Sequence, residues 1–86
     1  KYFDDPNNTD YGEYSDAKSL ICINKNLSKQ QQQSVFLHEM LHAIFMERGL
    51  NRHFTLDQEE IIVNTLEGGI FALMKDNPKL INYLME

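Results

Sequence analysis

The chain has little cysteine, few basic residues and no long apolar run. Its one cysteine, Cys22, cannot form an internal disulfide, and such usage is expected of a protein from a reducing compartment. Eight Lys and Arg residues stand against thirteen Asp and Glu residues, which gives a formal net charge of −5. Because that charge repels phosphate backbones and anionic membranes, it argues against nucleic acid and against a membrane surface as partners.

The apolar runs and the length of the chain bound its class. The longest runs, such as VFL and AIFM, are far too short to cross a bilayer. No charged leader followed by an apolar stretch opens the sequence, so no secretion signal is expected. The 86 residues predict one small domain, 1–86, which begins at Lys1 and could lack part of its N-terminus. A core of this size is modest and needs reinforcement.

Residues 1–27 predict a small β element. This part is rich in Asp, Asn and Gly, and it holds two β-prone stretches, YGEY and SLICIN, separated by SDAK. Those four residues could form the turn of a hairpin. Because two strands are barely stable alone in water, we expect them to pack on helices.

Residues 28–86 predict helices, the first of which begins after Ser28. Ser28 and Gln31 match a capping box, in which each side chain bonds the backbone N–H of the other residue. The helix is expected to run to about Arg48, where Gly49 supplies the left-handed stop.

Two further helices follow. Thr55 and Gln58 repeat the capping box, and this second helix is expected to reach about Lys75. Asn77–Pro78 should end it and begin a short C-terminal helix. The expected fold class is therefore α+β: a short hairpin or sheet, two long helices and a short third one.

Helical periodicity predicts the core, and two glycines interrupt it. Gly68 and Gly69 lie inside the second helix, where each costs about 1 kcal/mol relative to Ala. Two explanations are open: another backbone approaches closely there, or the glycines are a tolerated defect. The predicted core residues are Val35, Phe36, Leu41, Ile44, Phe45, Ile61, Ile62, Leu66, Ile70, Phe71, Leu73, Leu80, Ile81 and Leu84.

The stretch SVFLHEMLHAIF, residues 34–45, places His38 and His42 four residues apart around Glu39. Residues four apart share one face of a helix, so both imidazoles can reach one ion. Glu39 would lie beside that ion, where its carboxylate can take a proton from a bound water. The three residues form H-E-x-x-H, the zincin motif.

Two histidines at the surface or core edge, without a metal, are the alternative interpretation. The flanking residues are apolar almost all round, which is typical of a buried helix. Burying two imidazoles and a carboxylate there without partners would cost several kcal/mol. A bound metal removes that cost and contributes folding energy to a small domain.

A catalytic zinc ion needs a third protein ligand and one open position. The metzincin extension is absent, because Phe45 and Arg48 stand where it requires Gly and His. In the gluzincin pattern the third ligand is a Glu followed four residues later by Asp or Asn, and Glu60 with Asn64 has that spacing. Glu60 is the favoured ligand; the alternatives left open are Glu59, Asp57 and His53.

LHEMLHAIF followed by EEIIVNTLEGGIFALMKDNPKL resembles the small phage-encoded and mobile-element metallopeptidases of the ImmA/IrrE-like group, which are minimal gluzincins. The similarity runs from DYGEYSDAKSLICINKNLS to DNPKL, and its specific part is H-E-x-x-H plus E-x-x-x-N. The resemblance implies a short sheet, an H-E-x-x-H helix and a second helix that carries the third ligand. The sequence departs from the group in having less chain before the first strand, and VNTLE where larger relatives have A-N-x-F-A.

The expected function is that of a zinc-dependent metallopeptidase. Zn²⁺ would be held by His38, His42 and Glu60, and Glu39 would activate a zinc-bound water. The strand SLICIN is expected to offer an edge to an extended protein or peptide substrate. Oxyanion stabilisation could come from His53, Tyr11 or Tyr14.

The resemblance further implies a repressor or regulator protein as substrate, in the bacterial cytoplasm. One alternative is a non-catalytic binding module with a structural or vestigial metal site. A helical interaction domain without metal is a third hypothesis.

Overall fold

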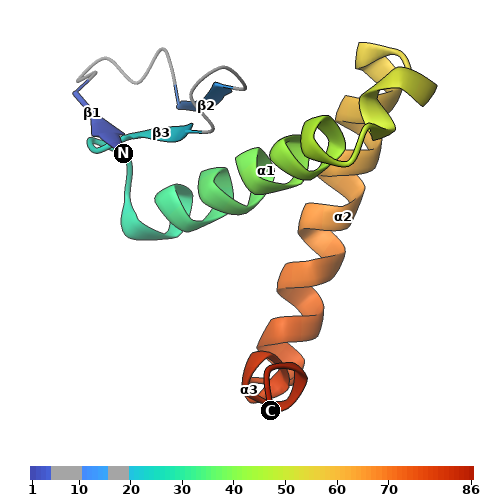
Figure 1. The fold of residues 1–86 in the computed structure, drawn as a ribbon. Helices are drawn as coiled ribbons and strands as arrows, with labels where there is room; N and C mark the ends of the chain where they lie inside the picture. Colours follow the sequence, from blue (N-terminus) through green and yellow to red (C-terminus); the bar gives the residue numbers. More distant parts are fainter. Residues whose placement is uncertain (5–10, 16–19) are drawn as a thin grey trace.

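The structure is a computed structural model that describes residues 1–4, 11–15 and 20–86 (Figure 1). A small sheet at the N-terminus is followed by helices, so the predicted α+β fold class is confirmed. In chain order the elements are β1 (Tyr2–Phe3), β2 (Gly12–Ser15), β3 (Leu20–Asn24), α1 (Lys29–Glu47), the 3-10 helix η1 (Leu50–His53), α2 (Leu56–Asp76) and α3 (Leu80–Leu84).

The sheet has the strand order β1-β3-β2. The predicted pairing of YGEY with SLICIN is confirmed, because β2 and β3 are antiparallel, with Gly12 opposite Ile23 and Ser15 opposite Leu20. The SDAK turn falls largely on residues 16–19, outside the described residues. β1 pairs with β3 in parallel and was not predicted from the sequence, since a strand of two residues gives no pattern.

The position of β3 corrects one expectation. The stretch SLICIN was expected to offer a free edge to a substrate, but β3 lies in the middle of the sheet and is paired on both sides. Within the described part of the chain, β1 and β2 are the edge strands, one on each side of β3.

Both predicted capping boxes are present. At α1, the Ser28 hydroxyl accepts from the Gln31 N–H and the Gln31 side chain accepts from the Ser28 N–H, each at 3.1 Å. Thr55 and Gln58 form the same pair of bonds at α2. α1 ends at the expected place, and Gly49 has a left-handed φ of 75°.

The end of the chain differs from the prediction. Asn77–Pro78 was expected both to end α2 and to begin the last helix. The first part is confirmed, because the backbone N–H and the side-chain amide of Asn77 both donate to the carbonyl of Leu73. The second part is wrong. Lys79 takes the cap position of α3, which begins at Leu80. An Asn used at the end of one helix is not available to begin the next.

The core is formed where α1 crosses the first half of α2 (Figure 1). Leu41, Phe45 and Val63 are buried there, and Val63 has no exposed surface. Ile23 of the central strand and Leu27, which follows that strand, are also buried. Several predicted core residues are instead exposed: Phe36, Ile44, Ile61, Leu66, Leu73, Ile81 and Leu84.

These misplaced core residues have a common physical cause. Each long helix is apolar on more than one face. Among the described elements α1 packs on α2 and on the strands β2 and β3, whereas α2 packs chiefly on α1, and Figure 1 shows α2 running away from the crossing towards α3. None of the helices described here is long and apolar enough to cross a membrane.

Gly12 marks the place where β2 lies against α1. A β-carbon on Gly12 would stand 2.5 Å from Val35 Cγ1 and 2.8 Å from the carbonyl oxygen of Cys22. Both distances are too short for real atoms, so only glycine allows this approach. At Gly68 and Gly69 an added β-carbon meets nothing within 4 Å among the described residues, so close backbone approach is not their role.

Candidate metal centre

The predicted metal ligands lie together where α1 faces the first turns of α2. One ligand atom each from His38, His42 and Glu60 can be chosen so that all lie within 4.8 Å of one another. The two Nε2 atoms are 3.2 Å apart. The Glu60 carboxylate spans them, with Oε1 at 3.0 Å from His38 Nε2 and Oε2 at 3.0 Å from His42 Nε2.

The outer nitrogens of both imidazoles also face carboxylates. His38 Nδ1 lies 2.9 Å from Glu67 Oε1, and His42 Nδ1 lies 2.6 Å from Glu59 Oε2. The second oxygen of Glu67 accepts a hydrogen bond of 2.8 Å from the Ser34 hydroxyl. Each imidazole is therefore held from its Nδ1 side.

These contacts decide what the inner nitrogens can do. An ionised carboxylate only accepts hydrogen bonds, so each Nδ1 must donate, and a neutral imidazole then turns the lone pair of Nε2 inward. With both imidazoles neutral, two such lone pairs and the two oxygens of Glu60 face one another at 3.0–3.2 Å. A divalent cation placed between them would be stabilised by all four atoms. The residues present thus fit a divalent metal ion with a His₂Glu ligand set.

Glu39 lies beside this group, half-buried on α1. Burial raises the pKa of its carboxyl group, because desolvation disfavours the charged form. The charges of His42 and His38 and a hydrogen bond with the backbone of Tyr14 act in the opposite direction, while Glu60 adds to the rise. The raised pKa of Glu39 makes it a better proton acceptor than an exposed carboxylate.

A cavity of about 290 Å³ opens beside Glu39, between β2 and the two long helices. It gives space for a reacting group next to the candidate ligands. Its lining residues are Tyr11, Gly12, Ser34, Val35, His38, Glu39 and Glu67.

The alternatives for the third ligand are placed differently from Glu60. Glu59 faces the outer nitrogen of His42, with its side chain only 12% exposed. Asp57 and His53 are exposed and do not belong to the group of possible ligands. Asn64, which completed the gluzincin spacing, is also exposed.

Glu67 and Ser34 were not predicted as part of the site from the sequence. Both could have been found from helical periodicity, because Glu67 follows Glu60 by seven residues, about two turns, and Ser34 precedes His38 by four. Of the residues considered for the oxyanion, Tyr14 donates its hydroxyl to Glu47 Oε1 at 2.9 Å, and Tyr11 lines the cavity.

Comparison with known proteins places the chain in a family. The peptidase family model described as the IrrE N-terminal-like domain matches residues 2–74, from β1 to near the end of α2. Neither the comparison with curated proteins nor that with solved structures found a match. The family consists of metallopeptidases, in keeping with the His-His-Glu group that could bind a metal ion. This chain, with most of its length covered by the match, belongs to the IrrE N-terminal-like peptidase family.

Proposed function

We propose that the protein is a zinc-dependent metallopeptidase that hydrolyses peptide bonds of a protein substrate. His38, His42 and Glu60 would hold the ion, and Glu39 would act as the general base. The observation that carries the proposal is the convergence of two imidazole Nε2 atoms and the Glu60 carboxylate, with contacts of 3.0–3.2 Å.

A bound zinc ion would supply Lewis acidity, which would polarise the scissile carbonyl and make the attacking water more acidic. Glu39 accepts a proton from the water that adds to the carbonyl carbon. As the C–N bond breaks, Glu39 returns this proton to the leaving amine. The half-buried position of Glu39 and its raised pKa support this role.

The substrate is proposed to bind as an extended peptide along β2. Three observations support this strand instead of β3. β2 lies at the edge of the described sheet, and the Tyr14 backbone forms a hydrogen bond with the Glu39 carboxylate. Gly12 and Tyr11 of the same segment line the cavity beside Glu39. A peptide adding to β2 would place its backbone next to the proposed base.

A repressor or regulator protein of the bacterial cytoplasm is the proposed substrate class. This part of the proposal is supported by the resemblance to phage and mobile-element members of the ImmA/IrrE-like group. The net charge of −5 disfavours nucleic acid as a direct partner.

Peptide cleavage by the Glu39→Gln variant tests the proposal. The amide keeps the shape of the side chain but cannot accept the proton, so cleavage of an unfolded protein substrate should fall by at least about 100-fold. Zinc content by elemental analysis should match the wild type. His42→Ala is the matched control, and it should lose both zinc and activity. Full activity in Glu39→Gln would contradict the assigned base.

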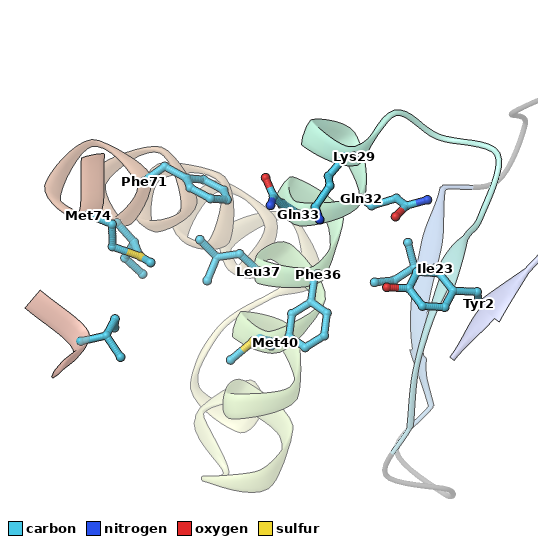
Figure 2. Close-up of a pocket in the computed structure, with 12 residues that line it drawn as sticks. Tyr2, Ile23, Lys29, Gln32, Gln33, Phe36, Leu37, Met40, Phe71 and Met74 are labelled. Carbon is cyan, nitrogen blue, oxygen red and sulfur yellow. The ribbon is translucent and has the colours of Figure 1, made fainter. Parts of the chain in front are cut away.

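A non-catalytic binding module is the second candidate, and an apolar cavity favours it. This cavity of about 690 Å³ shares no lining residue with the candidate metal centre. Figure 2 shows Phe36 and Met40 of α1, Phe71 and Met74 of α2, and Tyr2 around it. If the wild-type protein binds zinc but cleaves neither unfolded proteins nor repressors, this second function is favoured.

A further inference from the structure

We propose that Glu67 and Glu59 are positioning residues, each of which fixes one metal-binding imidazole through its Nδ1, and that Ser34 in turn holds Glu67. This inference rests on the proposed function, because it assigns a role to residues around the same metal centre. Glu67 and Ser34 had no predicted role, and Glu59 was predicted only as an alternative metal ligand.

The first contact chain runs from Ser34 through Glu67 to His38. Ser34 and His38 lie one turn apart on α1, and Glu67 reaches both from α2. Its Oε1 is 2.9 Å from His38 Nδ1, and its Oε2 is 2.8 Å from Ser34 Oγ. With both oxygens engaged, the carboxylate cannot rotate without breaking a hydrogen bond. The plane of the His38 ring is therefore fixed from α2.

The second contact joins Glu59 to His42 at 2.6 Å, the shortest hydrogen bond at this centre. Glu59 is adjacent to Glu60, and successive residues on a helix point about 100° apart. As a result, Glu60 faces the inner nitrogen of His42 while Glu59 faces its outer nitrogen. Two neighbouring carboxylates thus contact opposite sides of one imidazole, which leaves a distinct role for each.

These contacts matter for metal binding more than for packing. A carboxylate that accepts from Nδ1 fixes the tautomer and the ring orientation, and it increases the basicity of Nε2 towards a metal. Removing such a partner commonly weakens metal binding 10–100-fold or so. A purely structural contact would change the stability of the metal-free protein and leave metal affinity unaltered.

The test is the Zn²⁺ Kd of the full chain, measured by competition with a chromogenic chelator. Glu67→Ala should bind Zn²⁺ about 10–100-fold more weakly than the wild type. Glu67→Gln should recover part of this loss, because its amide oxygen can still accept from Nδ1. Ser34→Ala should have a smaller effect than Glu67→Ala. For the buried Glu59, Glu59→Gln keeps the size and an acceptor oxygen but removes the charge, so it should weaken Zn²⁺ binding by less than Glu67→Ala does.

Asp57→Asn is the matched control, since it removes an exposed carboxylate from the same helix outside the metal centre. Its Zn²⁺ Kd should stay within about twofold of the wild type. The visible absorption of the Co²⁺-substituted protein gives a second readout, which should shift in Glu67→Ala and not in Asp57→Asn. Melting of each variant in EDTA shows whether it still folds.

The outcomes separate the two proposals. If the wild type does not bind Zn²⁺, the proposed function fails and this inference fails with it. If the wild type binds Zn²⁺, and Glu67→Ala and Glu59→Gln bind it as tightly with unchanged Co²⁺ spectra, only the positioning role is overturned.

Discussion

At the scale of single residues, Glu39 should make the metal-free protein sensitive to pH. Its folded-state pKa lies above the ordinary value of 4.5 because of burial, so the folded protein holds this proton more tightly than the unfolded chain does. Below about pH 4.5 the bound proton makes its whole contribution to the free energy of unfolding. It is lost as the pH rises through the raised folded pKa.

Urea unfolding in EDTA across this pH range tests the effect. The wild type should lose free energy of unfolding relative to Glu39→Gln as the pH rises, and the variant should be the more stable protein at pH 7. Glu13→Gln removes an exposed carboxylate from β2 and should follow the wild type. Parallel pH profiles for the wild type and Glu39→Gln would show that burial of Glu39 has no such cost.

Gly12 is the second position at which a single substitution should change the stability of the protein. Gly12→Ala would bring a β-carbon to 2.5 Å from Val35 Cγ1 and 2.8 Å from the Cys22 carbonyl, so β2 must move away from α1. We expect a loss of about 1–3 kcal/mol in the free energy of unfolding. The double variant Gly12→Ala/Val35→Ala removes one of the two clashes and should recover part of this loss. Wild-type stability in Gly12→Ala would contradict the close approach.

The residue scale also shows what the sequence could predict of the site. The spacing along the helices singled out His38, His42 and Glu60 as candidate ligands, and these three residues lie together in the structure. Glu67 shares a face of α2 with Glu60, so periodicity could have suggested it, but only the crossing of α1 and α2 shows that it faces His38 Nδ1.

At the scale of elements, the helix boundaries were predicted well because they depend on local chemistry. Ser28 with Gln31 and Thr55 with Gln58 form capping boxes, and Gly49 has the left-handed conformation that ends α1. The predicted start of α3 was wrong because Asn77 can cap either helix, and the sequence does not show which one it caps.

Gly68 gives a prediction at this scale. It lies in the interior of α2, and an added β-carbon meets nothing within 4 Å among the described residues. Gly68→Ala should therefore stabilise the protein by about 0.5–1 kcal/mol, as measured by thermal or urea unfolding. Gly49→Ala is the contrasting variant, because a φ of 75° is strained for alanine, and it should destabilise. Destabilisation by Gly68→Ala would mean that something packs on that face of α2.

At the scale of the whole molecule, the sequence predicted more buried core residues than the structure has. Apolar periodicity marks every face that could be buried, but burial depends on what covers that face. Val63 is fully buried at the crossing, whereas Ile61, two residues earlier on α2, is exposed. The sequence shows which residues are apolar, and only the arrangement of α1 and α2 decides which of them are covered.

Removing the metal should affect the whole fold, because the proposed ligands come from both long helices. If free Zn²⁺ is 100 times its Kd, binding adds about 2.7 kcal/mol to the free energy of unfolding. For a chain of this length, EDTA should then lower the melting temperature by on the order of 10 °C. The variant His42→Ala should melt at the same temperature with and without EDTA. An unchanged melting temperature for the wild type would argue against a bound metal.

The positions of the donors along the chain bear on how the protein assembles. Every group at the metal centre lies between Ser34 and Glu67, on two helices joined by the short segment that holds η1. Closing such a short connection between the two helices costs little chain entropy. The helical hairpin therefore carries its own means of capturing an ion, and no pairing within the sheet is needed to bring the proposed ligands together.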